Sequence, residues 1–482
     1  MPKYADETYS DIILSVMAET KTILFVSVKN TIYMYYEKLL KAKFLAMCRA
    51  DNLLCITVQP ELEKELVHAN VRTISLQVLL SMVYEHKQDE CWYVTVFSKY
   101  GLNYYSIAYG TSMILYYSKH YFWKPLGVLC NECFEKISSY GMESMLMKEI
   151  AVLPILYEIF YKDFHLDRCV YAEWRRMLEE KIARLSSENT REAQQPMQKY
   201  RNRLAQYEER KLFISKEKDV VKCNFCQIGT KTFRISTHHT NIQGLPAELK
   251  HGLRPCDAGN ILMELDIAHS QIMLLAALSN EIKLLTYGEN DFYYWMASIF
   301  FQKDIQLVTE QERLAAKRTL LMMLNGAGQN AIREDLKKHG FLYTLAEVQN
   351  MKDTFFREFS HIKSYWTNLQ EAVSYGVPTG MFWECSRVTE GYKRIAMVLQ
   401  RLEAEWFIDI LVASRDYLQS LNAQVYLTIH DAIILEVPLG QDVEQVIKKM
   451  NEILLSCFLD IFPKYRTISS DIQVKFRGGL LC

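Results

Sequence analysis

Short apolar runs recur along this chain, and their spacing changes from one region to the next. Residues 1 to about 150 contain strand-like runs, TILFVSV and NLLCITV, beside helix-like runs, IYMYYEKLLKAKFLAM and VRTISLQVLLSMVYEH. Apolar runs of this length occur in strands and in buried helices alike, so each single assignment is ambiguous. Together they predict a small α/β domain over residues 1–150.

The segment from about residue 165 to 212 is highly charged and rich in helix-forming residues. This pattern predicts one or two long helices, with an interruption near Pro196 because proline lacks the backbone donor that a helix interior needs. Such helices could form a solvated hairpin, or they could lie along a nucleic-acid backbone. The spacing alone favours the solvated hairpin.

Strands and helices alternate in the second half of the chain. ILMELDI (261–267) predicts a buried strand, and SQIMLLAALS (270–279) predicts the helix after it. A mostly helical stretch covers residues 291–375. A further long helix, YKRIAMVLQRLEAEWFIDILVASRDYLQSL, precedes a hairpin over residues 425–437, and SDIQVKF predicts a last strand near the end of the chain.

Composition then limits the class of protein. The chain has 482 residues, of which 50% are apolar and 23% charged, as is ordinary for a globular protein of two to four domains. Because the net charge is −1, a nucleic-acid partner would need a local basic cleft. No apolar run is long enough to span a bilayer, and the start MPKYADETYS resembles neither a secretory signal nor a transit peptide. We therefore expect an intracellular protein, cytoplasmic or nucleoid-associated, with no membrane partner.

Twelve cysteines in such a chain are typical of reduced intracellular thiols. Two CxxC pairs, Cys130/Cys133 and Cys223/Cys226, each offer half of a structural zinc site, and the histidines at 238–239 are the nearest further ligands. Roughly ninety residues separate the two pairs. Buried free thiols are therefore the favoured interpretation, and a zinc site is the alternative.

Two aspartates stand at the polar ends of predicted strands. Asp266 ends ILMELDI, and Asp431 follows His430 at the tip of the hairpin TIHDAIILEVP. Each alone has an ordinary explanation, because aspartate caps helices and favours turns. Carboxylates on neighbouring strands would repel each other without a cation between them, and Mg²⁺ prefers oxygen ligands. Two metal ions held this way can activate a hydroxyl and stabilise a leaving phosphate oxygen.

The stretch TEQERLAAKRTLLMMLNGAGQNAI predicts a helix with one distinctive face. Thr309 and Glu312 fit a capping box at its start, and Gly326 and Gly328 fit its end. Four side chains recur every four residues and so share one face: Arg313, Lys317, Leu321 and Asn325. This face suits a nucleotide whose phosphates contact the two cations and whose base and sugar lie near the last two residues.

In order and spacing, these motifs resemble the bacterial DNA polymerase I family (family A). Motif A of the family is similar to LDIAHSQIMLLAALS, motif B to the row that ends in Asn325-Gly326, and motif C to His430-Asp431. FRISTHHTNIQGLP resembles the family's GRLSS...NLQNIP, and DFYYWMAS resembles DIHTxTAS with Tyr293 at the His position. Gln400 in VLQRLEAEW matches the Gln of the primer-side helix. The resemblance covers roughly residues 230–482.

The resemblance implies an α+β, right-handed polymerase fold with an antiparallel palm sheet and helical fingers and thumb. The thumb would cover residues 151–230, the palm 231–290 and 391–482, and the fingers 291–390. Residues 1–150 would form the N-terminal α/β domain. That domain could be a degenerate exonuclease-like domain, but it has no D-x-E signature, so a scaffold role is favoured.

The resemblance also implies the ligands of a site. Asp266, the Ile267 carbonyl and Asp431 would hold two Mg²⁺ ions, for which Mn²⁺ could substitute. The catalytic set would be the two aspartates and Lys317, which could protonate the leaving pyrophosphate. The residues that bind the incoming dNTP would be Arg313, Lys317, Leu321, Gln271, Asn325 and Tyr293. The residues that contact primer-template DNA would be Arg234, Asn241, Gln243, Arg254, Gln400 and His430. A replisome or processivity partner would be compatible with this role.

The chain departs from the family pattern at several of these positions. Ala432 replaces the Glu that many relatives have in motif C. Gln271 stands at the position of the family's steric-gate Glu, and Asn325 at that of its Tyr partner. Leu321 replaces the aromatic residue of the same helix. Gln271 and Asn325 could hydrogen-bond each other, but they would leave a differently shaped wall at the sugar 2′ and 3′ positions, so discrimination against ribonucleotides is in doubt.

The leading interpretation is a template-dependent DNA polymerase that joins dNTPs to a primer 3′-OH by two-metal nucleotidyl transfer, without proofreading. Replication, repair and a mobile element are all compatible with it. One alternative is a single-subunit phage-type RNA polymerase, or a ribonucleotide-tolerant polymerase, because motif A also resembles D-x3-S-G-I; the NIQGLP segment argues against the phage type. Another alternative is a catalytically silent, DNA-binding replication accessory, against which the intact aspartates and cations argue.

Overall fold

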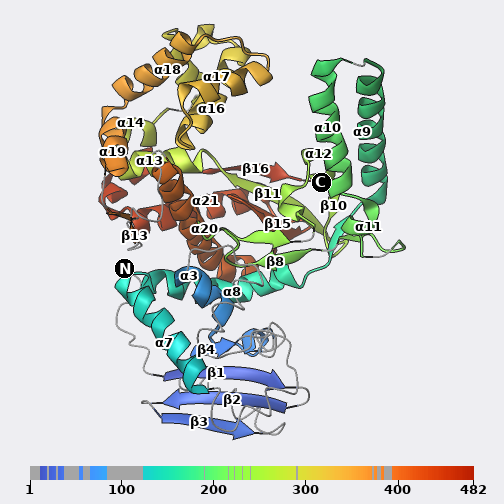
Figure 1. Ribbon diagram of the computed structural model, residues 1–482, viewed down its shortest axis with the longest axis vertical. Helices are drawn as coiled ribbons and strands as arrows, with labels where there is room; N and C mark the ends of the chain where they lie inside the picture. The colour runs from blue at the N-terminus through green and yellow to red at the C-terminus, as the bar shows by residue number, and fades with distance from the viewer. Residues whose placement is uncertain are drawn as a thin grey trace. The chain divides into compact units, whose positions relative to one another are not determined.

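The computed structural model describes most of the chain as two compact units (Figure 1). The first unit contains Met1–Asp266, Leu411–Lys448 and Gly478–Cys482, and the second contains Ile267–Ile410 and Lys449–Arg477. The described residues are 11–18, 21–28, 31–36, 54–57, 64, 66–83 and 123–481, with gaps at 189, 215, 222, 231, 239, 289–290, 372–373, 377–381 and 385–392.

The first unit begins with a five-stranded sheet in the order β3-β2-β1-β4-β5. β1 (Asp11–Ala18), β2 (Lys21–Val28) and β3 (Thr31–Tyr36) are antiparallel neighbours. β4 (Leu54–Thr57) is parallel to β1, and β5 (Thr73–Ser75) is parallel to β4. The strands predicted from TILFVSV and NLLCITV are confirmed as β2 and β4.

Two helix predictions in this region are wrong at their starts. The run IYMYYEKLLKAKFLAM begins in β3, because the β-branched and aromatic residues of TIYMYY favour a strand and pair with β2. Its remaining residues, 37–47, lie outside the described part of the chain. The run VRTISLQVLLSMVYEH first supplies β5 and only then forms α3 (Leu76–Val83).

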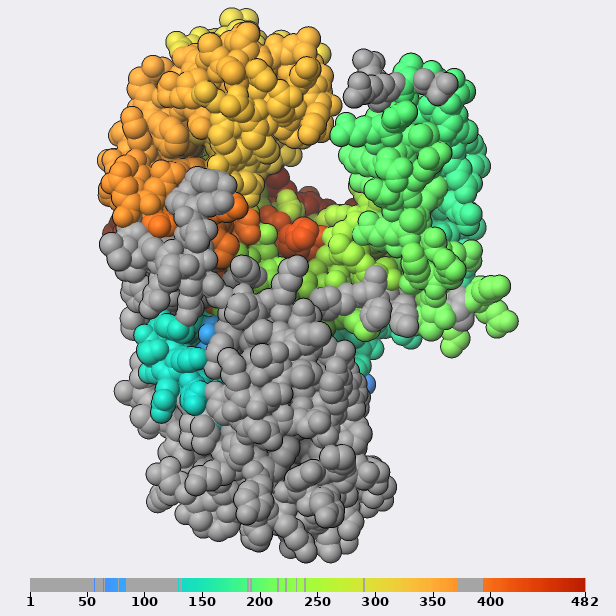
Figure 2. Space-filling model, in the orientation of Figure 1, coloured from blue at the N-terminus to red at the C-terminus, as the bar shows by residue number. Residues whose placement is uncertain are grey.

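Two charged helices of the first unit pack along each other, α9 (Arg168–Glu188) and α10 (Arg191–Gln206), drawn in green in Figure 2. The two predicted helices are therefore confirmed, but the break is not at Pro196, which lies inside α10. The boundary is set by Thr190, whose side chain accepts a hydrogen bond from the Ala193 N–H at 3.2 Å. The short helix α11 (Glu209–Leu212) follows.

The first unit also holds α7 (Trp123–Ser139), α8 (Glu143–Phe160) and a three-stranded sheet. That sheet has the order β10-β6-β7, with β6 at Phe164–Leu166, β7 at Val220–Val221 and β10 at Leu253–Arg254. A two-stranded ribbon, β8 (Asn224–Cys226) and β9 (Ser236–His238), lies between β7 and β10 in the sequence.

A four-stranded sheet carries the motif strands in the order β14-β15-β11-β16. The predicted strand is confirmed as β11 (Asn260–Ile267), and the predicted hairpin as β14 (Gln424–Ile429) and β15 (Ala432–Pro438). β11 and β14 are both antiparallel partners of β15. At the far edge β16 (Phe476–Leu480) approaches β11 so closely that a Cβ at Gly478 would lie 1.9 Å from the Glu264 carbonyl oxygen.

The strand predicted from SDIQVKF is wrong, because β16 begins only at Phe476. A 3₁₀ helix, η6 (Pro463–Asp471), occupies the start of that run. Ile472, Val474 and Phe476 are buried in alternation, as in a strand. However, the backbone of Gln473 donates to Leu285 O, and Lys475 O accepts from Ala268 N, so these groups bond to loop and helix ends rather than to a ladder.

The second unit is mainly helical, which confirms the prediction for residues 291–375. Its helices in that range are α15 (Phe292–Phe301), α16 (Glu310–Leu324), α17 (Gln329–Lys338), α18 (Leu345–Glu358) and α19 (Ser360–Glu371). A small hairpin follows, β12 (Ser374–Gly376) and β13 (Phe382–Glu384). Phe292, Phe300, Phe355 and Phe359 form part of the buried core of this unit.

The other elements of the second unit also match the sequence. The helix predicted at 270–279 is α13 (Ser270–Ser279), and the long helix before the hairpin is α20 (Arg394–Ser420). Two helices were not predicted, α14 (Ile282–Leu285) and α21 (Val443–Ile461), and the first turns of α21 belong to the first unit. None of the helices in the described part of the chain is both long and apolar enough to cross a bilayer. The architecture is α+β, as expected.

Candidate active site

The strand register in the first unit brings the two motif aspartates together. Asp266 on β11 pairs with Ala432 on β15, the residue directly after Asp431. Paired residues of antiparallel strands lie about 4.5–5.5 Å apart between their Cα atoms. Asp266 is exposed and Asp431 is half-exposed. The register places Asp266, at the end of β11, beside the loop that carries Asp431. The role of the two carboxylates as a metal site stays a prediction.

The hairpin that carries Asp431 is held by buried strands on both sides. Ile429 pairs with Ala432, so His430 and Asp431 form the two-residue loop between β14 and β15. His430 has a φ of 55°, which histidine tolerates better than a β-branched residue would. All residues of β15 from Ala432 to Val437 are buried. The buried strands therefore fix the backbone position of Asp431.

The donor set of this loop fits a hydrated hard cation. In the described residues, no group of three or more His, Cys, Asp or Glu side chains gathers that could enclose a metal ion. Mg²⁺ does not require such a cage, since it usually keeps several waters and takes one or two carboxylates together with substrate phosphates. Asp266 and Asp431 supply two carboxylates, and the chain continues from Asp266 into the Ile267 carbonyl.

Charged neighbours of the hairpin affect His430. Burial lowers the pKa of His430 from its ordinary value, the Arg234 charge lowers it further, and Asp431 opposes the shift. His430 and Arg234, both predicted to contact DNA, therefore lie near each other in the first unit. A neutral imidazole can donate one hydrogen bond and accept another.

Three other predicted DNA contacts have partners inside the first unit. Gln243 is only 7% exposed, and its Nε2 donates to the Thr428 carbonyl at 3.0 Å. Asn241 accepts from the Gly244 N–H at 3.0 Å and so caps a 3₁₀ turn. Arg254 pairs with Asp167 at 2.8 Å. Of these three side chains, Gln243 bonds to the hairpin strand β14. The contacts of all three with DNA stay predictions.

The predicted capping box is present at the start of α16 in the second unit. The same helix carries the two predicted cationic side chains, Arg313 and Lys317, which we call the cationic row. Thr309 and Glu312 form the reciprocal capping box, and the helix ends at Leu324 with Gly326 at a φ of 77°. Arg313 is half-buried, and it bonds bidentately to Asp291, with Nε–Oδ1 at 3.2 Å and Nη2–Oδ2 at 3.0 Å. Its Nη1 donates to Glu310 at 3.0 Å.

Asp291 was missed by the sequence reasoning, although its position carried a signal. It precedes the apolar run FYYW, where an aspartate is a typical helix N-cap. Its Oδ1 accepts from the Tyr293 and Tyr294 N–H groups, at 2.9 and 3.2 Å, and so begins α15. Burial raises the pKa of Asp291, but hydrogen bonds from Arg313 and the two backbone groups outweigh it, and the net pKa is lowered.

Lys317 is exposed one turn after Arg313, and it lies over an aromatic ring. Its Nζ is 5.2 Å from the ring centroid of Tyr293, which is 7% exposed. The Tyr293 ring meets the His269 ring edge-to-face at 4.8 Å. Burial, with the Arg477 charge, lowers the pKa of His269 to about 3, so this imidazole is neutral and can accept from Arg477 Nη2 at 2.6 Å.

Gln271 and Asn325 bond to α20 in the second unit rather than to each other. Asn325 donates to Leu321 O at 2.8 Å and accepts from Gln400 Nε2 at 3.4 Å. Gln271 Nε2 donates to Glu403 Oε2 at 3.4 Å. Glu403 was missed by the sequence reasoning. The signal was its spacing, since a residue three positions after Gln400 shares a helix face with it.

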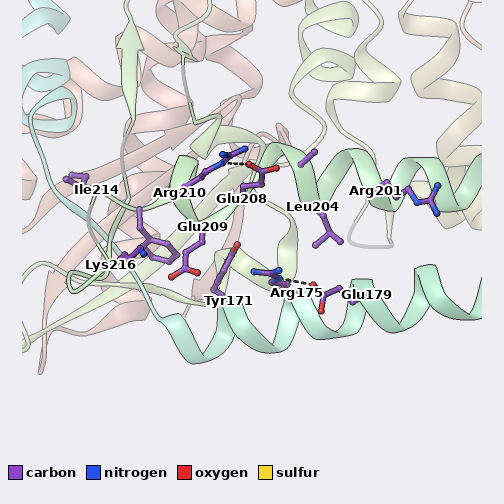
Figure 3. Close-up of a pocket in the computed structure, with 12 residues that line it drawn as sticks. Tyr171, Arg175, Glu179, Arg201, Leu204, Glu208, Glu209, Arg210, Ile214 and Lys216 are labelled. Carbon is purple, nitrogen blue, oxygen red and sulfur yellow. Dashed lines mark hydrogen bonds and ion pairs between the residues drawn. The ribbon is translucent and has the colours of Figure 1, made fainter.

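Two cavities accompany these elements. One of about 820 Å³ lies along α9, α10 and α11 in the first unit (Figure 3). Its lining includes two ion pairs, Arg175–Glu179 at 2.9 Å and Arg210–Glu208 at 2.8 Å, but none of the predicted site residues. The other, of about 650 Å³, lies at the end of α16 in the second unit and is lined in part by Gly326, Lys352, Lys363, Phe356 and Trp366.

The cysteines whose side chains the structure describes are free thiols. Cys223 Sγ contacts Thr240 O at 3.4 Å, and Cys226 Sγ contacts Ile228 O at 3.3 Å. Burial raises the pKa of Cys223 to about 12 and that of Cys226 to about 11, so both favour the protonated thiol. Cys133 is buried and free as well. The side chains of Cys130 and of residues 238–239 lie outside the described part of the chain, so the zinc alternative is untested there.

The chain is similar to known DNA polymerases in sequence. The model of DNA polymerase family A matches residues 156–462. DNA polymerase I of Caldicellulosiruptor bescii is 23% identical over 256 residues, which covers 48% of this chain and 30% of that protein. The thermostable DNA polymerase I of Thermus filiformis is 26% identical over 250 residues, which covers 47% of this chain and 29% of that protein. The chain thus matches under a third of the length of either relative.

A solved structure shares the architecture over nearly the whole chain. It is the polymerase domain of Pol1 from M. smegmatis, in complex with DNA primer-template and dNTP. The TM-score is 0.72, with 12% sequence identity, 99% of this chain covered and 96% of the other. The likeness shows that the two chains have the same fold, including the antiparallel sheet and the helical elements predicted from the sequence.

Proposed function

This chain belongs to DNA polymerase family A, and from that membership we infer that it is a template-dependent DNA polymerase. The observation that carries the proposal is the register of β11 and β15, which places Asp266 opposite the residue after Asp431. Asp266 is exposed and Asp431 is half-exposed, and a divalent cation held by both would offset the repulsion between their carboxylates. In a phosphoryl-transfer enzyme such a cation also stabilises charge on the phosphate oxygens.

The proposed reaction joins a nucleotide to the primer. The primer 3′ oxygen forms a bond to the α-phosphorus of a dNTP while the bond to pyrophosphate breaks, and one proton leaves the 3′ hydroxyl. Asp266, the Ile267 carbonyl and Asp431 would hold two Mg²⁺ ions, which when bound lower the pKa of the hydroxyl and stabilise charge on the phosphate oxygens. Lys317 would give a proton to the departing pyrophosphate.

Arg313 can bind a phosphate without losing its present partners. A guanidinium has five N–H donors, and Arg313 uses one each from Nε, Nη1 and Nη2 on Asp291 and Glu310. Two donors therefore remain for a triphosphate. Tyr293, packed against His269 and beneath Lys317, would limit how the lysine approaches its phosphate.

Primer extension on a DNA template tests the proposal directly. The assay would contain Mg²⁺ and single dNTPs, with the unchanged protein beside Asp431→Asn and Asp416→Asn. Asp416 is an exposed carboxylate on α20 and serves as a matched control for the loss of one negative charge. Template-directed addition that is lost only in Asp431→Asn supports the polymerase and its metal pair.

Two other outcomes would favour the competing functions. Duplex binding without addition of any nucleotide would support a silent replication accessory. Addition of ribonucleotides as efficient as that of dNTPs would support a ribonucleotide-tolerant polymerase, a candidate favoured by the amide of Gln271 in place of a carboxylate. Degradation of a mispaired primer end in the absence of nucleotides would contradict the proposed lack of proofreading.

A further inference from the structure

A buried carboxylate on α20 meets the start of α13 in the second unit. Glu403 is only 2% exposed. Its Oε1 accepts from the Ser270 hydroxyl, and its Oε2 accepts from Gln271 Nε2 at 3.4 Å. Ser270 is itself 4% exposed. An ionised carboxylate is costly to bury without such donors, so these two contacts belong to one arrangement around Glu403.

The same face of α20 also holds the end of α16. Gln400 lies three residues before Glu403, which places both side chains on one face of the helix. Gln400 contacts Asn325, and Glu403 contacts Gln271. These are the two residues proposed to form the wall around the nucleotide sugar. Each of them is therefore bonded to α20, one turn apart.

The chemistry of the contact fixes the direction of the Gln271 amide. Gln271 presents its NH₂ group to Glu403, since its Nε2 donates to Glu403 Oε2. The Gln271 carbonyl oxygen is then turned away from Glu403. A glutamine held by this hydrogen bond keeps one rotamer and one direction of its amide oxygen. A glutamine without such a bond samples several rotamers.

We propose that Glu403 is a positioning residue that holds Gln271 in place and thereby sets discrimination between deoxyribonucleotides and ribonucleotides. This inference rests on the polymerase function proposed above. Gln271, held by its amide, presents a fixed wall to the sugar.

The variant Glu403→Gln tests this role with little change in shape. Ser270 continues to donate to the remaining oxygen at position 403, so the new NH₂ group faces the NH₂ group of Gln271. Two donors cannot bond, and Gln271 turns away. We expect the ratio of kcat/KM for a dNTP to that for its ribonucleotide to fall about tenfold, in the range that a hydrogen bond to a charged group contributes.

A second background separates positioning from a general structural effect. Glu403→Gln is combined with Gln271→Ala, and the same selectivity ratio is measured by single-nucleotide addition. If Glu403 acts through Gln271, it has no further effect on the ratio when the Gln271 side chain is absent. Asp416→Asn, which removes an exposed carboxylate from the same helix, should leave the ratio unchanged in both backgrounds.

Ser270→Ala provides a variant that keeps the carboxyl group of Glu403. It removes the hydroxyl that orients the carboxylate, so the ratio should fall in the same direction but less than in Glu403→Gln. This variant carries the test if thermal melting shows that Glu403→Gln does not fold.

Each remaining outcome overturns a specific statement. An unchanged ratio in folded Glu403→Gln, or an equal fall in the presence and absence of the Gln271 side chain, overturns the positioning role and leaves the polymerase intact. Failure of the unchanged protein to add any nucleotide overturns the proposed function, and the sugar wall with it.

Discussion

The two residue sets proposed to bind the metal ions and the triphosphate are held in place by different interactions. In the first unit, Asp266 and Asp431 are placed by backbone pairing between β11 and β15. In the second unit, Arg313 and Lys317 are placed by side-chain contacts with Asp291, Glu310 and the Tyr293 ring. The positions of the two aspartates therefore depend on the sheet. The positions of the Arg313 and Lys317 side chains depend on neighbouring side chains that can be changed one at a time.

This difference separates what a substitution can do in each unit. Changing one of the two aspartates would remove a proposed metal ligand but leave its backbone position, since the register does not depend on the side chain. Changing a neighbour of Arg313 or Lys317 alters the orientation of that side chain, while its positive charge remains. The first kind of change should act on chemistry alone, and the second on both chemistry and local stability.

The largest expected effect is in the first unit. Asp266→Asn keeps the size of the side chain but removes the charge of a proposed metal ligand. We expect dNTP addition to fall by about a thousandfold or more, because metal stabilisation contributes several kcal/mol. Single-turnover primer extension measures this. Thermal melting of the same variant should change little, and a large drop in melting temperature would contradict the idea that the strands alone fix this position.

The next effect is on the cationic row of the second unit. Lys317→Ala should lower kcat for dNTP addition by about a hundredfold or more, because it removes a charge that would stabilise the leaving pyrophosphate. Lys337→Ala, an exposed lysine on α17, is the matched control and should have no effect. Equal losses in the two variants would show that only overall charge matters.

Asp291→Asn tests how a neighbour supports the row. The folded-state pKa of Asp291 is lowered, so the ionised carboxylate contributes stability that is present above its ordinary pKa of 3.8 and lost as pH falls through the lower folded value. The variant should have a lower melting temperature at pH 7 and a shallower decline on acidification below about pH 4. Melting curves from pH 3 to pH 7 measure this.

The exposed Asp353 of α18 supplies the control for that experiment. Asp353→Asn should leave the acid-side decline unchanged. If Asp291→Asn and the unchanged protein lose stability in parallel below pH 4, then the Arg313 contact does not stabilise the ionised carboxylate.

The smallest expected effect concerns helix capping. Thr309→Ala and Thr344→Ala each remove the same capping box, at the starts of α16 and α18, and each should cost about 1 kcal/mol of unfolding free energy. Denaturant unfolding compares them. Only Thr309→Ala should also raise KM for dNTP, because only α16 carries the cationic row; the same rise in both variants would separate the row from its helix.

The sequence contained most of the elements around the candidate site. Period and capping signals predicted α13 and α16, and the polar tip within apolar strands predicted the hairpin. These features are local, since each depends on residues within one helix or one turn. The pairing of β11 with β15 is not local. It was indicated by the carboxylates of Asp266 and Asp431, which would suit a shared cation if their strands were neighbours.

The misses share a physical cause, which is that partners far apart in the sequence decided the outcome. TIYMYY forms β3 because β2 pairs with it, and residues 472–475 are extended without a ladder because loops take their hydrogen bonds. Glu403 and Gln271 are 132 residues apart, so no periodic pattern links them. The hydrogen bond from Gln243 to the Thr428 carbonyl likewise joins residues that are 185 positions apart.

The close approach at Gly478 has a consequence for how this protein is handled. β16 covers one edge of the four-stranded sheet, and the opposite edge strand, β14, is blocked differently, because Lys162 and Gln243 occupy its carbonyls at Val425 and Thr428. A chain shortened before Phe476, or one with a bulkier residue at 478, would uncover the backbone donors and acceptors of β11. Unpaired strand edges recruit other chains, so such a protein should self-associate through β11 and precipitate on concentration.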